Sequence, residues 1–231
     1  MGMVKDILFD LDDTLFDFHA DERVALEKTF ASLNIPLDDA VCARYSEINK
    51  AQWKALELGE INRAQVKLRR FELLFEELGY GPEKAGQAAK TYHERLAEDF
   101  HYIDGAPELL EELNGKYRMF LVSNGNLSVQ EGRLKKSGIG RYFAGIFISE
   151  VLGAEKPSRR FFDLAFEKIP DFDPACAVIV GDSLTSDIRG GINAGVRTIW
   201  FNPKGEPAVP EIPADHEVRK LKDLPELLRR I

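Results

Sequence analysis

Four short polar clusters in the sequence contain residue types that can handle a phosphate group. In chain order they are Asp10-Leu11-Asp12-Asp13-Thr14, Ser123-Asn124-Gly125, Lys156-Pro157 and Gly181-Asp182-Ser183-Leu184-Thr185-Ser186-Asp187. If the clusters converge, they bring four carboxylates into one cleft, those of Asp10, Asp12, Asp182 and Asp187. Like charges a few ångströms apart repel strongly, so either a cation or protonation must offset the charge.

Magnesium is the cation that this set of donors favours. The donors are oxygens alone, without His or Cys, and such sites select hard ions. An ion held by few carboxylates keeps coordination positions for water and a substrate phosphate. Lys156 would add a second positive charge for that phosphate, and Ser123 and Asn124 can donate hydrogen bonds to its oxygens. We therefore expect Mg²⁺ as cofactor and Ser123, Asn124 and Lys156 as phosphate-binding residues.

The carboxylates at positions 10 and 12 can divide the work of phosphoryl transfer. One of them, bound to the metal, can attack phosphorus. The other, kept off the metal, can protonate the leaving oxygen and later activate water. Positioning and electrostatic stabilisation supply most of the catalysis in this chemistry. The spacing therefore predicts an enzyme that acts on a small-molecule phosphomonoester.

The elements that must position these clusters are strands alternating with helices. Apolar runs predict strands at 4–9, 119–123, 145–149, 177–180, 197–201 and near 216–218. Helical periodicity predicts helices at 106–113, 128–137, 158–169, 186–194 and 224–229. This alternation is typical of a Rossmann-like, doubly wound parallel sheet, an α/β fold whose ligands bind at the carboxyl ends of the strands. The clusters follow predicted strands, and Lys156 fits least closely because it lies well past Ile148.

Residues from about 20 to 100 show a different spacing of apolar residues. Long stretches with helical spacing cover 22–33, 39–58, 64–78 and 82–100, and Gly and Pro separate them. We predict an all-helical cap at 17–103, inserted into a core that consists of 1–16 and 104–231. An insert that leaves the carboxyl end of the first strand would cover the site as a lid, which excludes water and selects substrates.

The composition argues against some classes of binding partner and some cellular locations. The formal net charge of −8 argues against binding to a nucleic-acid polymer and to anionic membranes, both of which rely on basic surface. The two cysteines, Cys42 and Cys176, stand far apart and suit a reducing compartment. No long apolar run predicts a signal peptide or membrane span, so we expect a cytoplasmic protein, as a monomer or small homo-oligomer.

The four clusters, in this order, resemble the four motifs of the haloacid dehalogenase superfamily, and the helical insert resembles its C1 cap. The resemblance implies that Asp10 is the nucleophile and Asp12 the general acid and base. It also implies that Mg²⁺ binds the Asp10 side chain, the Asp12 backbone carbonyl and Asp182, with Asp187 as a direct or water-mediated partner. Ser123 and Lys156 would bind the phosphoryl group.

Further residues resemble a branch of the superfamily, the 5′-nucleotidase-like enzymes that act on pyrimidine nucleoside monophosphates. They are Asp13-Thr14-Leu15-Phe16, Ser123-Asn124-Gly125, Gly190-Gly191-Ile192-Asn193-Ala194-Gly195, Asn49-Lys50-Ala51-Gln52-Trp53 and Arg70-Phe71-Glu72. Substrate choice must come from the cap, because the core motifs handle only the phosphoryl group. Phe16, Asn49 and Trp53 are the candidate substrate contacts, although buried packing is the commoner role of such aromatic residues.

Four other functions compete with a nucleotidase. A sugar-phosphate or small phosphoacid phosphatase would share every core motif. A phosphosugar mutase would share the aspartyl-phosphate step. A dehalogenase needs neither a metal nor an acid for the leaving oxygen, so the presence of Asp12 argues against it. A binding module without catalysis would be expected to lose at least one cluster, and all four are present.

Overall fold

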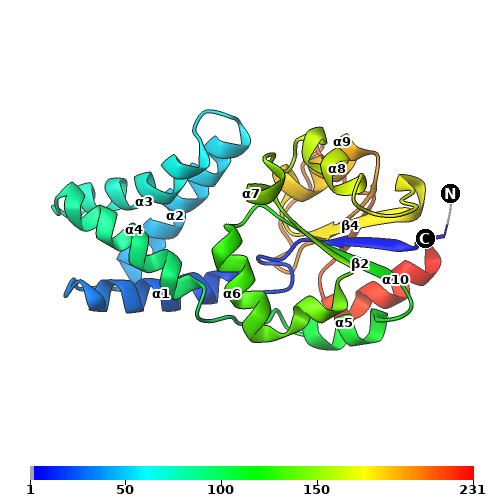
Figure 1. The fold of residues 1–231 in the computed structure, drawn as a ribbon, viewed down its shortest axis with the longest axis horizontal. Helices are drawn as coiled ribbons and strands as arrows, with labels where there is room; N and C mark the ends of the chain where they lie inside the picture. Colours follow the sequence, from blue (N-terminus) through cyan, green and yellow to red (C-terminus); the bar gives the residue numbers. More distant parts are fainter. Residues whose placement is uncertain (1–2) are drawn as a thin grey trace. The chain divides into compact units, whose positions relative to one another are not determined.

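The computed structural model describes residues 3–231, and one of its two compact units is built on a parallel β-sheet (Figure 1). The sheet has six strands in the order β3-β2-β1-β4-β5-β6. All five pairings between neighbouring strands are parallel. The strands are β1 (Asp6–Phe9), β2 (Arg118–Ser123), β3 (Gly145–Ile148), β4 (Ala177–Gly181), β5 (Arg197–Phe201) and β6 (His216–Val218). The predicted α/β fold with a doubly wound parallel sheet is confirmed.

Six helices of the same part of the chain cover both faces of the sheet. They are α5 (Ala106–Leu113), α6 (Leu127–Ser137), α7 (Ser149–Leu152), α8 (Arg159–Phe166), α9 (Arg189–Ala194) and α10 (Leu224–Arg230). In Figure 1, α8 and α9 lie on one side of the sheet and α5 and α10 on the other. Strands covered on both faces read as continuous apolar runs, and every residue of β4 is buried.

Several predicted boundaries differ from the structure. The helix expected at 158–169 is shorter, since α8 ends at Phe166. Ser149 begins α7 instead of ending a strand. The helix expected at 186–194 is a π-helical turn over Leu184–Ile188 followed by α9. Short 3₁₀ turns also occur at Ile139–Tyr142, Pro174–Cys176 and Leu221–Asp223.

The chain separates into two compact units. One contains the described residues up to Phe18 together with His101–Ile231, and the other is His19–Phe100. The helices of the second unit are α1 (Phe18–Ser32), α2 (Asp39–Glu57), α3 (Arg63–Glu77) and α4 (Pro82–Leu96). The predicted insert at 17–103 has slightly wider bounds, and its role as a cap stays a prediction.

Capping residues begin the helices of this second unit. Asp38 accepts the Val41 backbone N–H at the start of α2. Asn62 and Gln65 form a reciprocal capping box at the start of α3.

Tyr45, Phe71 and Tyr92 pack against one another in the centre of this second unit, where all three are fully buried. None of the helices among the described residues is long and apolar enough to cross a membrane.

Candidate active site

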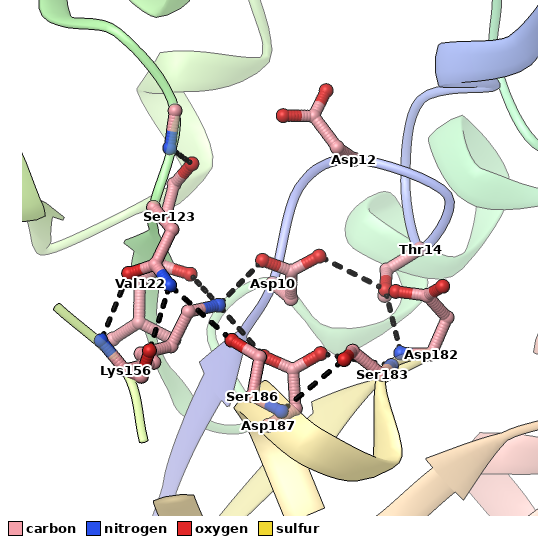
Figure 2. Close-up of polar contacts among 12 residues, drawn as sticks. Asp10, Asp12, Thr14, Val122, Ser123, Lys156, Asp182, Ser183, Ser186 and Asp187 are labelled. Carbon is pink, nitrogen blue, oxygen red and sulfur yellow. Dashed lines mark hydrogen bonds and ion pairs between the residues drawn. The ribbon is translucent and has the colours of Figure 1, made fainter. Parts of the chain in front are cut away.

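The predicted clusters meet beyond the carboxyl ends of β1, β2 and β4, because these strands are neighbours in the sheet (Figure 2). Asp10 follows β1 directly, and its backbone N–H donates to the Val180 carbonyl of β4 at 2.9 Å. The residue as a whole is 7% exposed. One carboxylate oxygen accepts from Lys156, and Thr14 donates to the other at 3.3 Å. The Asp10 carboxylate therefore has contacts on both of its oxygens.

Lys156 is buried between two carboxylates. Its ammonium nitrogen lies 2.6 Å from Asp10 Oδ1, 2.6 Å from Asp187 Oδ1 and 2.9 Å from the Val122 carbonyl oxygen. Burial by itself lowers the pKa of Lys156, but the charges of Asp10 and Asp187 outweigh burial and raise that pKa above its usual value. The two carboxylates therefore favour the charged form of Lys156.

The loop after β4 supplies two further carboxylates. Asp187 accepts the Ser183 backbone N–H at 3.1 Å, inside the π-helical turn. A Cβ atom at Gly181 would lie 2.3 Å from the Asp187 carboxyl carbon, so only glycine admits this side chain. Trp200 donates from its indole nitrogen to the Asp182 carbonyl oxygen at 2.8 Å. These contacts fix the Asp187 carboxylate and the backbone of Asp182.

Asp10, Asp182 and Asp187 fit a hard divalent cation. Each offers one carboxylate oxygen, and the three atoms lie within 4.8 Å of one another. Burial, together with the charge of Asp187, raises the pKa of Asp10 to about 8, while Lys156 acts in the opposite direction. Burial and Asp187 also raise the pKa of Asp182 well above its usual value. One lysine thus leaves negative charge uncompensated, and an oxygen-only donor set suits Mg²⁺.

The Asp12 side chain lies apart from this carboxylate group. In Figure 2 it turns away from Asp10 and Asp187. Gln130 donates to its Oδ2 atom at 2.7 Å, and Arg133 donates to its Oδ1 atom at 2.5 Å. Both partners come from α6, and the sequence reasoning missed them along with Thr14. A polar residue in an amphipathic helix is usually solvated, so only their burial distinguishes them.

Ser123 and Asn124, at the end of β2, have different surroundings. Ser123 Oγ accepts from the Gly125 backbone N–H and from Gln130, each at 3.0 Å. Asn124 pairs with the backbone of Lys156, since its amide nitrogen donates to the Lys156 carbonyl and its amide oxygen accepts the Lys156 N–H, both at 2.9 Å. This pairing anchors Lys156 and does not support the predicted contact between Asn124 and phosphate.

A family described as haloacid dehalogenase-like hydrolase matches residues 4–195 of this chain. The chain belongs to the haloacid dehalogenase-like hydrolase family. It is 41% identical over 229 residues to the hydrolase YfnB of Bacillus subtilis, covering 99% of this chain and 97% of that protein. It is 38% identical to the pyrimidine 5′-nucleotidase PynA of Streptococcus pneumoniae, covering 95% and 93%. The pyrimidine 5′-nucleotidase YjjG of Escherichia coli is 33% identical, covering 96% of each chain.

A solved structure of the family carries a metal. The crystal structure of YfnB from B. subtilis is bound to magnesium and is described as revealing interdomain movement. It superposes on this chain with a TM-score of 0.94 at 40% identity, covering 98% of this chain and 99% of that one. The family membership inferred from the four sequence motifs is therefore confirmed.

The predicted substrate contacts of this family member are mostly buried. Phe16 is fully buried beneath the guanidinium of Arg133, 4.8 Å from its ring centroid. Asn49 is 4% exposed, and its amide donates to Glu22 and accepts from Arg70. Both side chains are buried in this structure, and their contact with substrate stays a prediction. The half-buried Trp53, with the Arg63 guanidinium 5.8 Å from its ring, is the remaining candidate.

Proposed function

We propose that this protein is a magnesium-dependent phosphomonoester hydrolase that forms an aspartyl-phosphate on Asp10. The observation that carries the proposal is the division between the two carboxylates after β1. Asp10 lies against Lys156 and two other carboxylates, whereas Asp12 is held apart from them by α6. A nucleophile must lie beside the charges that bind phosphate, and a proton donor must avoid the metal to keep its proton.

The metal would be held by the carboxylates of Asp10, Asp182 and Asp187, together with the backbone carbonyl of Asp12. When bound, Mg²⁺ supplies positive charge that orients the phosphoryl group and neutralises its oxygens. The chain's own cation, Lys156, which contacts Asp10 Oδ1, would stabilise the same charge. We place Ser123 at the phosphoryl oxygens as well, because its hydroxyl accepts two hydrogen bonds and can still donate one.

The reaction has two half-steps on this chain. A carboxylate oxygen of Asp10 bonds to phosphorus as the bond to the leaving oxygen breaks, and Asp12 gives that oxygen its proton. Asp12 then takes a proton from water, whose oxygen bonds to phosphorus while the phosphorus bond to Asp10 breaks. Inorganic phosphate leaves, and both carboxyl groups return to their starting forms.

We propose nucleoside 5′-monophosphates, pyrimidines first, as the substrates. Two relatives that share most of their length with this chain, at 38% and 33% identity, carry the name pyrimidine 5′-nucleotidase. A flat base can stack on an aromatic face for roughly 1–3 kcal/mol, which a hexose cannot do. We also propose that the helical unit serves as the lid and that the protein acts in the cytoplasm.

Phosphate release from a panel of nucleotides, sugar phosphates and small phosphoacids tests this proposal. We expect activity that depends on Mg²⁺, is lost with EDTA, and has a higher kcat/KM for nucleoside 5′-monophosphates than for hexose phosphates. Asp10→Asn keeps the shape of the side chain but removes the attacking charge, so turnover should vanish. Undiminished turnover in that variant would contradict the mechanism, and a preference for hexose phosphates would favour a sugar-phosphate phosphatase instead.

A further inference from the structure

Gln130 and Arg133 are a deeply buried polar pair on α6, and the proposed reaction has so far given neither of them a role. Arg133 is fully buried, and Gln130 is 1% exposed. Removing a guanidinium from water costs several kcal/mol, and a buried ion pair is often no more stabilising than an apolar replacement. Their contacts, rather than a contribution to stability, must therefore explain why α6 carries them.

The contacts of Gln130 connect the proposed acid, Asp12, with the proposed phosphate-binding residue, Ser123. Its amide nitrogen donates to Asp12 Oδ2 at 2.7 Å and to Ser123 Oγ at 3.0 Å. Its amide oxygen accepts from Arg133 at 3.1 Å, which fixes the orientation of the amide. A flipped amide would set an oxygen against the Asp12 carboxylate, so only one orientation satisfies every contact.

Arg133 holds the other oxygen of Asp12 and also the loop that carries it. The guanidinium donates to Asp12 Oδ1 at 2.5 Å and lies 4.8 Å from the ring centroid of Phe16. Asp12 and Phe16 themselves form a β-bridge within this loop. The guanidinium is thus fixed between a ring and a carboxylate on one loop, which leaves the Asp12 side chain little freedom.

The backbone at Gly125 is shaped to admit this arrangement. A Cβ atom at that position would lie 2.0 Å from the Gln130 amide nitrogen. The turn after β2 therefore requires glycine so that Gln130 can reach Ser123 and Asp12 together. The glycine that follows Ser123-Asn124 in the sequence has its physical explanation in this close approach.

We infer that Gln130 and Arg133 are positioning residues. They orient the Asp12 carboxyl group for its proton transfers and fix its position relative to Ser123, which we place at the phosphoryl group. Misplacing a reacting group by about 1 Å can cost roughly a hundredfold in rate. This inference rests on the proposed function.

Two substrates that differ in their need for an acid test the inference. A nucleoside 5′-monophosphate has an alkoxide leaving group that requires a proton, whereas p-nitrophenyl phosphate releases a stabilised phenolate. The measured quantity is the ratio of kcat/KM for the alkyl ester to kcat/KM for the aryl ester. Both values come from one preparation, so any inactive fraction of a variant cancels in the ratio.

Asp12→Asn sets the reference and should lower this ratio by about 10²–10⁴, the usual contribution of a general acid. We expect Arg133→Met and Gln130→Met to lower it by about 10–100-fold, the range for residues that orient a functional group. Arg133→Lys keeps the charge and should recover part of the loss. Leu134→Ala is the matched control, because it removes a buried neighbour on α6 and should reduce both kcat/KM values equally.

The outcomes separate the inference from the function on which it rests. A lowered ratio in Arg133→Met or Gln130→Met, with an unchanged ratio in Leu134→Ala, would support the inference. A wild-type ratio in both variants, beside a lowered ratio in Asp12→Asn, would overturn it and leave the proposed function intact. A wild-type ratio in Asp12→Asn itself would overturn the acid role of Asp12 and the inference together.

Discussion

The ammonium nitrogen of Lys156 lies 2.6 Å from Asp10 Oδ1, and both residues are buried. The carboxylate that we propose as the nucleophile is thus paired with a cation of the chain itself. The same ammonium group also contacts Asp187, so one lysine separates two carboxylates. The first two predictions follow from this arrangement.

Lys156→Met should destabilise the metal-free protein. Breaking a buried ion pair by removing one partner typically costs about 3–5 kcal/mol, because the remaining charge is uncompensated. Urea unfolding in EDTA at pH 8 measures the loss in the free energy of unfolding. Mg²⁺ should restore part of it, since the metal binds the carboxylates that Lys156 leaves. Lys135→Met, which removes an exposed lysine, is the control. An equal loss in both variants would contradict the bridging role of Lys156.

Without metal, stability should fall as the pH rises toward 8. Burial raises the pKa of Asp10 from 3.8 to about 8, so between these values the folded protein binds a proton that the unfolded chain has released. The free energy of unfolding then declines with rising pH by up to about 1.4 kcal/mol per unit for each such proton, and levels off above pH 8.

Thermal melting from pH 5 to 9, with EDTA and with Mg²⁺, measures this slope. Saturating Mg²⁺ should flatten it, because the metal keeps the carboxylates ionised in the folded state. Asp10→Asn should reduce the slope in EDTA, since residue 10 can no longer titrate while Asp182, whose pKa is also raised, still does. Identical slopes for the wild type and Asp10→Asn would show that another group is responsible.

The stability of the Glu22→Gln variant should increase relative to that of the wild type as the pH rises. Burial raises the pKa of Glu22 above its ordinary value of 4.5, against the opposing hydrogen bond from Ser46. The wild type therefore loses stability as the pH rises from 4.5 through the folded-state pKa, and the variant lacks that loss. Unfolding experiments at pH 5 and pH 8 give the change. Glu27→Gln, at an exposed position, should show no such trend.

Trp53→Ala should raise KM for nucleotides more than for hexose phosphates. If the indole stacks on the base, its loss costs roughly 1–3 kcal/mol of binding, a factor of about 5–150. Steady-state kinetics on both classes measure the difference. Leu58→Ala, which removes an exposed apolar side chain at the end of α2, is the matched control. An equal change in KM for both classes would remove Trp53 from the substrate site.

Much of this protein follows from its sequence because the decisive signals are local. Apolar runs alternate with helical stretches, which predicts the parallel sheet. Polar clusters just after these runs predict convergence, since the ends of parallel strands share one edge. That rule places Asp10 and Asp182, each directly after a strand, whereas Lys156 follows α7 and Asp187 lies in the π-helical turn.

The tertiary structure decided what surrounds each functional group. Gln130 and Arg133 reach Asp12 from α6, which lies more than a hundred residues further along the chain, and nothing in their helical spacing distinguishes them from solvated residues. Burial likewise gives Phe16 a packing role under Arg133 and places Asn49 in contact with Glu22 and Arg70. Residue type and spacing indicate which chemistry is available. Long-range packing decides which side chains are dry, paired and oriented, because both desolvation and hydrogen bonding depend on neighbours that only the folded chain brings together.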